Sequence, residues 1–140
     1  MAIRQLSVFV ENKKGSLHEI TDVLAKAGID LRSMCIADTS DYGIVRIIAD
    51  DPVRAQAILA EAGHIANVRE VTAFAVPDAP GGLAQVLDML EENSISIEYL
   101  YALVTKHVGK AYAVTRTDAP EKAEQVLSAS GIELLSEENI

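Results

Sequence analysis

The chain carries an internal repeat, and this repeat constrains the fold more than any other feature of the sequence. An offset of 66 residues pairs Gly15 with Gly81, and further along the chain an offset of 68 residues pairs Gly63 with Gly131. A period of this size is longer than a solenoid repeat and fits a small module of helices and strands. Two such modules in one chain usually form a pseudo-two-fold pair, so a ligand is expected at their shared interface.

Hydrophobic periodicity predicts the same order of elements in both halves. In the first half we expect strands at 4–11, 29–37, 43–49 and 68–76, and helices at 16–27 and 52–62. In the second half we expect helices at 82–93 and 118–130, strands at 95–104 and 110–116, a turn at 106–109 and a last short strand at 132–135. This βαββαβ order is the split βαβ pattern of ferredoxin-like folds. The predicted class is therefore α+β, with two ferredoxin-like modules and antiparallel sheets.

Residues 68–76 are expected to serve both modules. The order of elements needs this stretch to close the first module, and the repeat offset makes it the first strand of the second. The predicted modules are therefore 1–68 and 69–140, joined through a shared or continuous strand. The join contains no stretch rich in Pro, Ser or Gly, so the modules are not expected to move freely.

Local signals predict how the helices begin and end. Ser16 with Glu19 fits a capping box at the start of the first helix, and Gly28 is placed to end it. Asp50-Asp51 before Pro52 indicates a capped second helix.

Charge and composition exclude several classes of protein. The net charge is -9 and the 12 basic residues are scattered, which argues against nucleic acid as a partner. No apolar run approaches the roughly 20 residues that a membrane span needs. No signal peptide is recognisable at the N-terminus, and the single cysteine, Cys35, fits a reducing compartment. The expected location is the cytoplasm, with no membrane partner.

The turn before the first helix of each module is the best candidate for a binding site. Glycine permits a positive φ or a close backbone approach, and the N–H groups at a helix N-terminus favour an anion such as a carboxylate. Just upstream, the side chain of Asn12 or Asp78 can accept a hydrogen bond from an ammonium group. Such a loop offers complementary ends to an amino acid zwitterion, although a turn between a strand and a helix is more often only a turn. The candidate residues are Asn12, Gly15, Ser16 and Leu17 in the first module, and Asp78, Pro80, Gly81, Gly82 and Leu83 in the second.

The repeated βαββαβ order and the Asp78-x-Pro80-Gly81 turn resemble a tandem pair of ACT domains, small regulatory modules that bind amino acids. The resemblance covers essentially all 140 residues and includes the exit from the helix at Asn93-Ser94-Ile95. The first module departs from the motif, with Asn12 for Asp and Lys14 for Pro. Asn at the first position is common in that family, whereas the loss of Pro is expected to loosen the loop.

The resemblance implies further ligand contacts on the second strand of each module. In amino-acid-binding members a polar residue at the start of that strand meets the ligand, which sits between the loop of one domain and the second strand of its partner. The corresponding positions are Asp30 and Ser96. By the same analogy, the pocket is expected to be lined by Met34, Cys35 and Ile36, or by Leu100, Tyr101 and Ala102.

Other chemistry-bearing residues are better explained by structure. His18, His64 and His107 do not stand at metal-ligand spacing and are interpreted as surface or turn histidines. Cys35 lies in the middle of a strand, where a buried inert thiol is more usual than a nucleophile. Tyr99 and Tyr101 share a strand face, where packing and pocket lining both remain open. We therefore expect no cofactor, metal or catalytic residue.

The sequence as a whole predicts a non-catalytic sensor or regulatory protein that binds a free L-amino acid at the module interface. With no enzyme domain in the chain, regulation is expected to act in trans on an enzyme partner or pathway. A homodimer or larger oligomer is expected, because ACT-like modules usually bury surfaces against another copy. The alternative is a protein–protein interaction subunit with degenerate ligand sites, which Lys14 in the first module keeps open. A small enzyme on a ferredoxin-like scaffold is a third alternative.

Overall fold

The computed structural model describes residues 2–38, 41–104 and 109–140. It divides into two compact units, an N-terminal unit of Arg4–Glu70 and a C-terminal unit formed mainly by Val71–Ile140. The turn expected at 106–109 and the histidine His107 fall largely outside the described residues.

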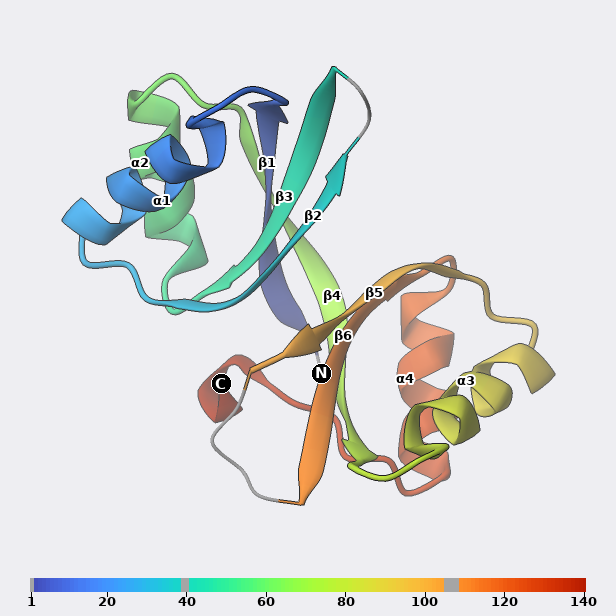
Figure 1. Cartoon of the computed structure of the whole chain (residues 1–140). Coiled ribbons are helices and arrows are strands. Elements are labelled where there is room, and N and C mark those ends of the chain that lie inside the picture. Colours follow the sequence, from blue (N-terminus) through green and yellow to red (C-terminus); the bar gives the residue numbers. More distant parts are fainter. Residues whose placement is uncertain (1, 39–40, 105–108) are drawn as a thin grey trace. The chain divides into compact units, whose positions relative to one another are not determined.

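The N-terminal unit is a sheet covered on one face by two helices (Figure 1). Its strand order is β2-β3-β1-β4, with β1 and β2 both antiparallel to β3. The helices bury one face of this sheet around Leu6, Ile20, Leu24 and Leu59, all fully buried. Its elements are β1 (Ile3–Glu11), α1 (Ser16–Lys26), β2 (Leu31–Asp38), β3 (Tyr42–Ala49), α2 (Pro52–Glu61) and the first part of β4 (Ala66–Pro77).

The C-terminal unit repeats this arrangement with a shortened last strand. The strand order is β4-β6-β5, and β6 runs antiparallel to both neighbours. The strand expected at 132–135 is reduced to a single antiparallel bridge between Phe74 and Leu134, and a short 3-10 helix at Glu137–Asn139 follows it. The other elements are α3 (Gly82–Glu92), β5 (Ile97–Leu103), β6 (Lys110–Thr117) and α4 (Pro120–Ala129).

Strand β4 is one continuous strand of 12 residues that contributes to both units. Its first five residues, Ala66–Glu70, belong to the N-terminal unit. From Val71 to Val76 every residue is buried, and the part from Thr72 to Pro77 pairs with β6. The continuous strand predicted from the sequence is therefore confirmed, as is the α+β class with two βαββαβ modules.

One of the predicted helix ends differs in the structure. Gly15, with φ 85°, is the N-cap residue that precedes α1, and no side-chain hydrogen bond caps this end of the helix, so the capping box of Ser16 with Glu19 is wrong. A left-handed glycine turns the chain into the helix, which places Ser16 inside the first turn. The cap at the second helix is confirmed, because the Asp51 side chain accepts a hydrogen bond from the Arg54 N–H at 3.1 Å.

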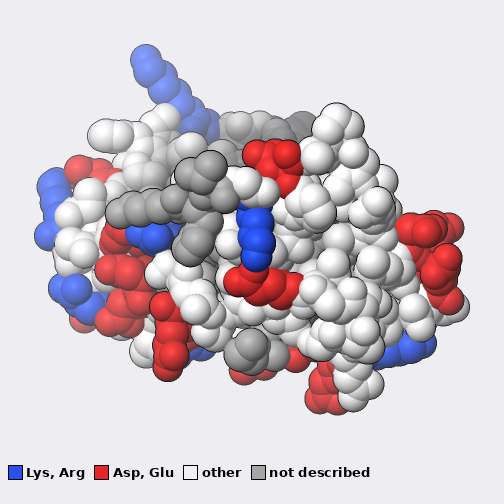
Figure 2. Space-filling model, turned by 90° about the horizontal axis from the view of Figure 1, so that it is seen from below, with Lys and Arg blue, Asp and Glu red and all other residues white. Residues whose placement is uncertain are grey.

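Surface charge is mixed. On the face shown in Figure 2, Lys and Arg side chains are interspersed with Asp and Glu side chains. Among the described residues, no helix combines the length and the apolar character needed to cross a bilayer.

Candidate functional site

The two glycine turns have the same pattern of backbone hydrogen bonds. The Glu19 N–H donates to the Gly15 carbonyl at 3.0 Å, and the Gln85 N–H donates to the Gly81 carbonyl at 3.1 Å. Both glycines are left-handed, with φ 85° and 83°, as expected from the sequence. Other residues are strained in this region, so glycine suits both positions.

The close backbone approach occurs at Gly82 and not at Gly81. A Cβ atom on Gly82 would lie 2.1 Å from the Pro77 carbonyl oxygen, whereas a Cβ on Gly81 would meet nothing within 4 Å. In the N-terminal unit the equivalent of Gly82 is Ser16, whose side chain is half-buried and lines a cavity. The two turns therefore share a backbone conformation but differ in the space beside the helix.

A cavity of about 470 Å³ lies beside the turn of the N-terminal unit. Its size is in the range of small-molecule sites. Its walls come from the end of β1, the first turns of α1, the start of β3 and the connection from α2 to β4. The lining residues are Phe9, Val10, Glu11, Lys13, Ser16, Glu19, Ile20, Tyr42, Gly63, His64 and Ile65.

The cavity exists because β1 extends further than the chain that pairs with its edge. The Phe9 N–H donates to the Ile65 carbonyl at 3.0 Å, while β1 continues to Glu11. Before Ile65 the chain turns back to the end of α2, where the His64 N–H donates to the Leu59 carbonyl at 2.9 Å. The last residues of β1 and the first turns of α1 are thus left to border an open space.

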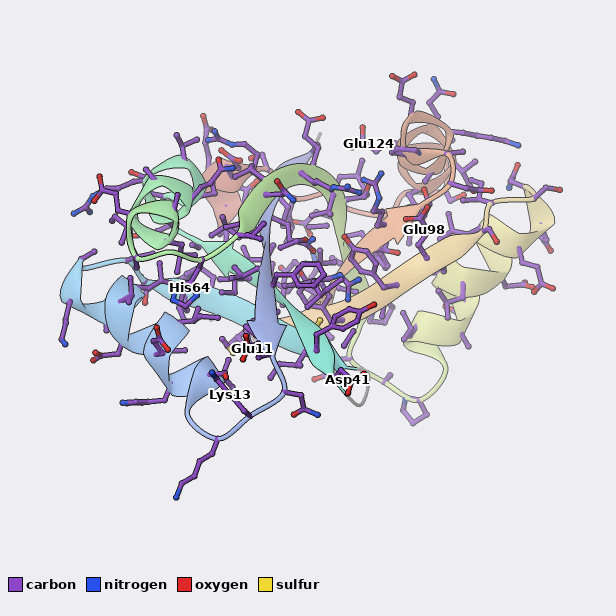
Figure 3. All side chains as sticks on the ribbon, turned by 90° about the horizontal axis from the view of Figure 1, so that it is seen from above. Glu11, Lys13, Asp41, His64, Glu98 and Glu124 are labelled. Atoms are coloured by element: carbon purple, nitrogen blue, oxygen red, sulfur yellow. The ribbon has the colours of Figure 1, made fainter. Side chains whose placement is uncertain are left out.

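Charged groups of both signs line this cavity. Lys13 Nζ lies 3.0 Å from Glu11 Oε2, and this hydrogen bond to Glu11 raises the pKa of the Lys13 ammonium above its ordinary value. His64 Nε2 lies 3.5 Å from Glu19 Oε1. Figure 3 shows Glu11, Lys13 and His64 around the first turns of α1.

His64 is more buried than the sequence indicates. Its side chain is only 16% exposed, and among the described residues its Nε2 atom has no hydrogen-bond partner. The separation of 3.5 Å from Glu19 is compatible with an ion pair, although it is too long for a good hydrogen bond. A buried polar atom of this kind normally finds a partner, and because this Nε2 atom is closed to solvent, the nearby Glu19 carboxylate is the group available to it.

Equivalent hydrogen bonds hold the start of the second strand in both repeats. The Asp30 N–H donates to the Asp50 side chain at 3.0 Å, and the Ser96 N–H donates to the Asp118 side chain at 2.9 Å. The Asp30 carboxylate also pairs with Arg32 at 3.1 Å. Both predicted ligand positions are exposed, but neither lines the cavity described above.

The mid-strand residues suggested by the resemblance do not share one face. Met34 and Leu100 pack against the cores of their units, while the neighbouring side chains point to the other face of each strand. Tyr101 is 8% exposed and stacks on Tyr99 with ring centroids 6.4 Å apart, so their shared strand face is observed. Partial burial raises the pKa of the Cys35 thiol, which favours its protonated, unreactive form.

Of the predicted site residues, only Ser16 lines the cavity. The turn that contains Ser16 also contains Asn12, Gly15 and Leu17. The residues from Asp78 to Leu83 form the turn of the other unit. Sequence reasoning missed Glu19 and His64 as site residues. The sequence does set these two residues apart, because the second repeat has Gln85 in place of Glu19 and Ile132 in place of His64. Among the described residues, no group of three or more His, Cys, Asp or Glu could hold a metal ion.

Comparison with known proteins identifies a family and a fold. The family described as ACT domain pair matches residues 1–140. A crystallised protein from Bacteroides thetaiotaomicron is 37% identical with a TM-score of 0.92, and the match covers 99% of this chain and 95% of that chain. The comparison with curated proteins gave no match.

More distant structures share the fold alone. The ligand-free regulatory subunit of aspartate kinase from Thermus thermophilus is 14% identical with a TM-score of 0.66, covering 90% of this chain and 91% of that chain. The corresponding subunit from Thermus flavus is 15% identical with a TM-score of 0.60, covering 91% of this chain and 92% of that chain.

Proposed function

The chain belongs to the ACT domain pair family, and on this premise we propose that it is a non-catalytic regulatory protein that binds a free L-amino acid. The observation that carries the proposal is the cavity of about 470 Å³ at the glycine turn before α1. It combines carboxylates, an ammonium group and apolar walls, which suits a zwitterion with a side chain. Its location is also where the helix N-terminus favours a carboxylate.

We propose that the regulation acts in trans, on an enzyme in another chain. The ACT domain pair matches residues 1–140, so these residues form the regulatory part of the proposed pair. Two proteins that share the fold are named as regulatory subunits of an aspartate kinase, which provides a precedent for such an arrangement. Co-purification can identify the partner enzyme, whereas the fold alone does not specify it.

A thermal-shift screen against the proteinogenic amino acids tests the binding proposal. At about 100 times its dissociation constant, the correct ligand should raise the free energy of unfolding by about 2.7 kcal/mol, because it binds only the folded state. Calorimetry then supplies the stoichiometry. No shift with any amino acid, together with no heat of binding, would favour the alternative of an interaction subunit with degenerate ligand sites.

We also propose that the protein forms a homodimer or larger oligomer. Large apolar side chains are exposed on the N-terminal unit, including Ile36 on β2 at 47% and Val53 on α2 at 55%. Symmetric association is the usual way in which such surfaces are covered. Sedimentation at micromolar concentration should therefore show a species of at least twice the chain mass of 15.0 kDa, and a purely monomeric species would contradict the proposal.

A further inference from the structure

Three large apolar side chains lie exposed together on the N-terminal unit. Phe9 is 49% exposed, Tyr42 is 46% exposed and Ile65 is 68% exposed. The rings of Phe9 and Tyr42 stack with centroids 5.2 Å apart, and the Phe9 N–H donates to the Ile65 carbonyl at 3.0 Å. All three residues also line the same cavity. They therefore form one surface, which we call the Phe9 patch.

The two aromatic rings of the patch lie on the face of the sheet that the helices of this unit leave uncovered. Val8 on β1 is part of the core beneath the helices, and side chains alternate along a strand, so Phe9 points to the opposite face. Val45 on β3 is likewise in the core, which directs Tyr42 to the same face as Phe9. The helices α1 and α2 therefore do not bury these rings.

Two positions of the patch carry other residues in the C-terminal unit. The Ala75 N–H donates to the Glu133 carbonyl at 2.9 Å, as the Phe9 N–H does to the Ile65 carbonyl. Ala75 therefore occupies the place of Phe9, and Glu133 occupies that of Ile65. Ala75 is buried and Glu133 is exposed, so neither position exposes a large apolar side chain.

The third position completes an ion pair in the C-terminal unit. Lys110 stands in the place of Tyr42, because it opposes the last residue of β4 as Tyr42 opposes the last residue of β1. Lys110 Nζ lies 2.6 Å from Glu133 Oε2, and the small Ala75 lies on the strand between them. The same module accepts charged residues at these positions, so the fold alone does not require the apolar side chains of the Phe9 patch.

The exposed apolar area suits the centre of an interface. The three side chains expose on the order of 300 Å² of mainly apolar surface, which is in the range of functional patches on monomeric proteins. A stable dimer buries about 800 Å² on each copy, with aromatic side chains at the centre and polar groups around them. The Phe9 patch supplies such a centre, and the charged residues of the adjoining cavity supply part of a rim, namely Glu11, Lys13 and Glu19.

Charge favours a second copy of the chain as the occupant. Residues 4–70 carry eight Lys and Arg against ten Asp and Glu, whereas residues 71–140 carry four against eleven. Two copies therefore repel each other least where they meet through the N-terminal unit, whose net charge is -2 against -7 for the C-terminal unit. The rim of the patch holds both signs, in Lys13 and Glu11, which suits a self-complementary contact. A strongly basic partner would be attracted to the C-terminal unit instead.

We propose that the Phe9 patch is the surface through which two copies of the chain associate, with each patch packed on the same patch of the other copy around a two-fold axis. This inference rests on the proposed homodimer and adds the surface that forms it. The N-terminal unit makes the contact, and the equivalent surface of the C-terminal unit, with its ion pair of Lys110 and Glu133, does not.

Sedimentation velocity over a range of protein concentrations tests this surface. The triple variant Phe9→Ala/Tyr42→Lys/Ile65→Glu installs the residues of the second repeat without changing the net charge, and it should weaken dimerisation at least about a hundredfold. Ile65→Glu alone, at the most exposed of the three positions, should weaken it at least about tenfold. Val53→Glu is the matched control, because it also places a carboxylate at an exposed apolar position, but on α2, and it should leave dimerisation unchanged.

Urea unfolding separates a lost contact from a lost fold, because each folded variant should keep a cooperative transition. If the triple variant does not fold, Ile65→Glu decides the outcome. A folded variant of the patch that dimerises as tightly as the unaltered protein would overturn the surface while the proposed homodimer stood. Equal loss of dimer in Val53→Glu and Ile65→Glu would do the same. An unaltered protein that remains at 15.0 kDa up to its highest soluble concentration would overturn both proposals.

Discussion

Cutting the chain into residues 1–67 and 68–140 is expected to leave neither fragment cooperatively folded. The first fragment loses nearly all of β4, including Val68, which packs against the core of the N-terminal unit. Its β1 strand would then expose its edge and the core beneath it to water. The second fragment loses Ile3, which is fully buried and groups with the C-terminal unit.

A fragment of residues 1–77 is the matched control, because it keeps all of β4. In thermal or urea unfolding it should show a cooperative transition that the 1–67 fragment lacks, although its second half of β4 remains an exposed edge. Cooperative unfolding of both 1–67 and 68–140 would show that the continuous strand is dispensable.

Replacing Gly82 with alanine is expected to destabilise the protein by about 3 kcal/mol, the upper end of the usual cost of overpacking. Helix propensity alone predicts the opposite sign, because alanine is favoured over glycine in a helix by roughly 0.5–1 kcal/mol. Sterics should win, since the new Cβ atom would lie 2.1 Å from the backbone oxygen of Pro77, which cannot rotate away as a side chain could.

Ser16→Ala is the matched control, because it also places an alanine at this position of the turn, but in the N-terminal unit. A Cβ atom already fits at Ser16, so the free energy of unfolding should change little. Urea titrations of both variants measure the difference in their free energies of unfolding when the two proteins have the same m-value. A Gly82→Ala protein as stable as the unaltered one would mean that the turn of the C-terminal unit adjusts more easily than its backbone contacts indicate.

Much of the fold follows from the sequence because its signals are local. The spacing of apolar residues predicted the helices and strands, and the repeat predicted that β4 would be continuous. One helix end and one strand differ from the expectation, the first for a local reason and the second for a long-range one. Ser16 carries the signature of a capping residue, yet its left-handed neighbour Gly15 is the N-cap residue of α1. The last strand shrinks to one bridge, because Leu134 pairs with Phe74 at a single point.

One part of the candidate site also follows from the sequence, and another part depends on the tertiary structure. The sequence alone determined the two glycine turns, since a positive φ at Gly15 and Gly81 depends on the residue itself and on the start of a helix. Only the tertiary structure revealed the cavity, because it requires the end of β1 and the turn after α2 to meet beside α1. That meeting brings Glu19 and His64 within 3.5 Å of each other across 45 residues of sequence. Likewise, the close approach falls on Gly82 because the carbonyl of Pro77 lies there, and no property of glycine alone could distinguish it from Gly81.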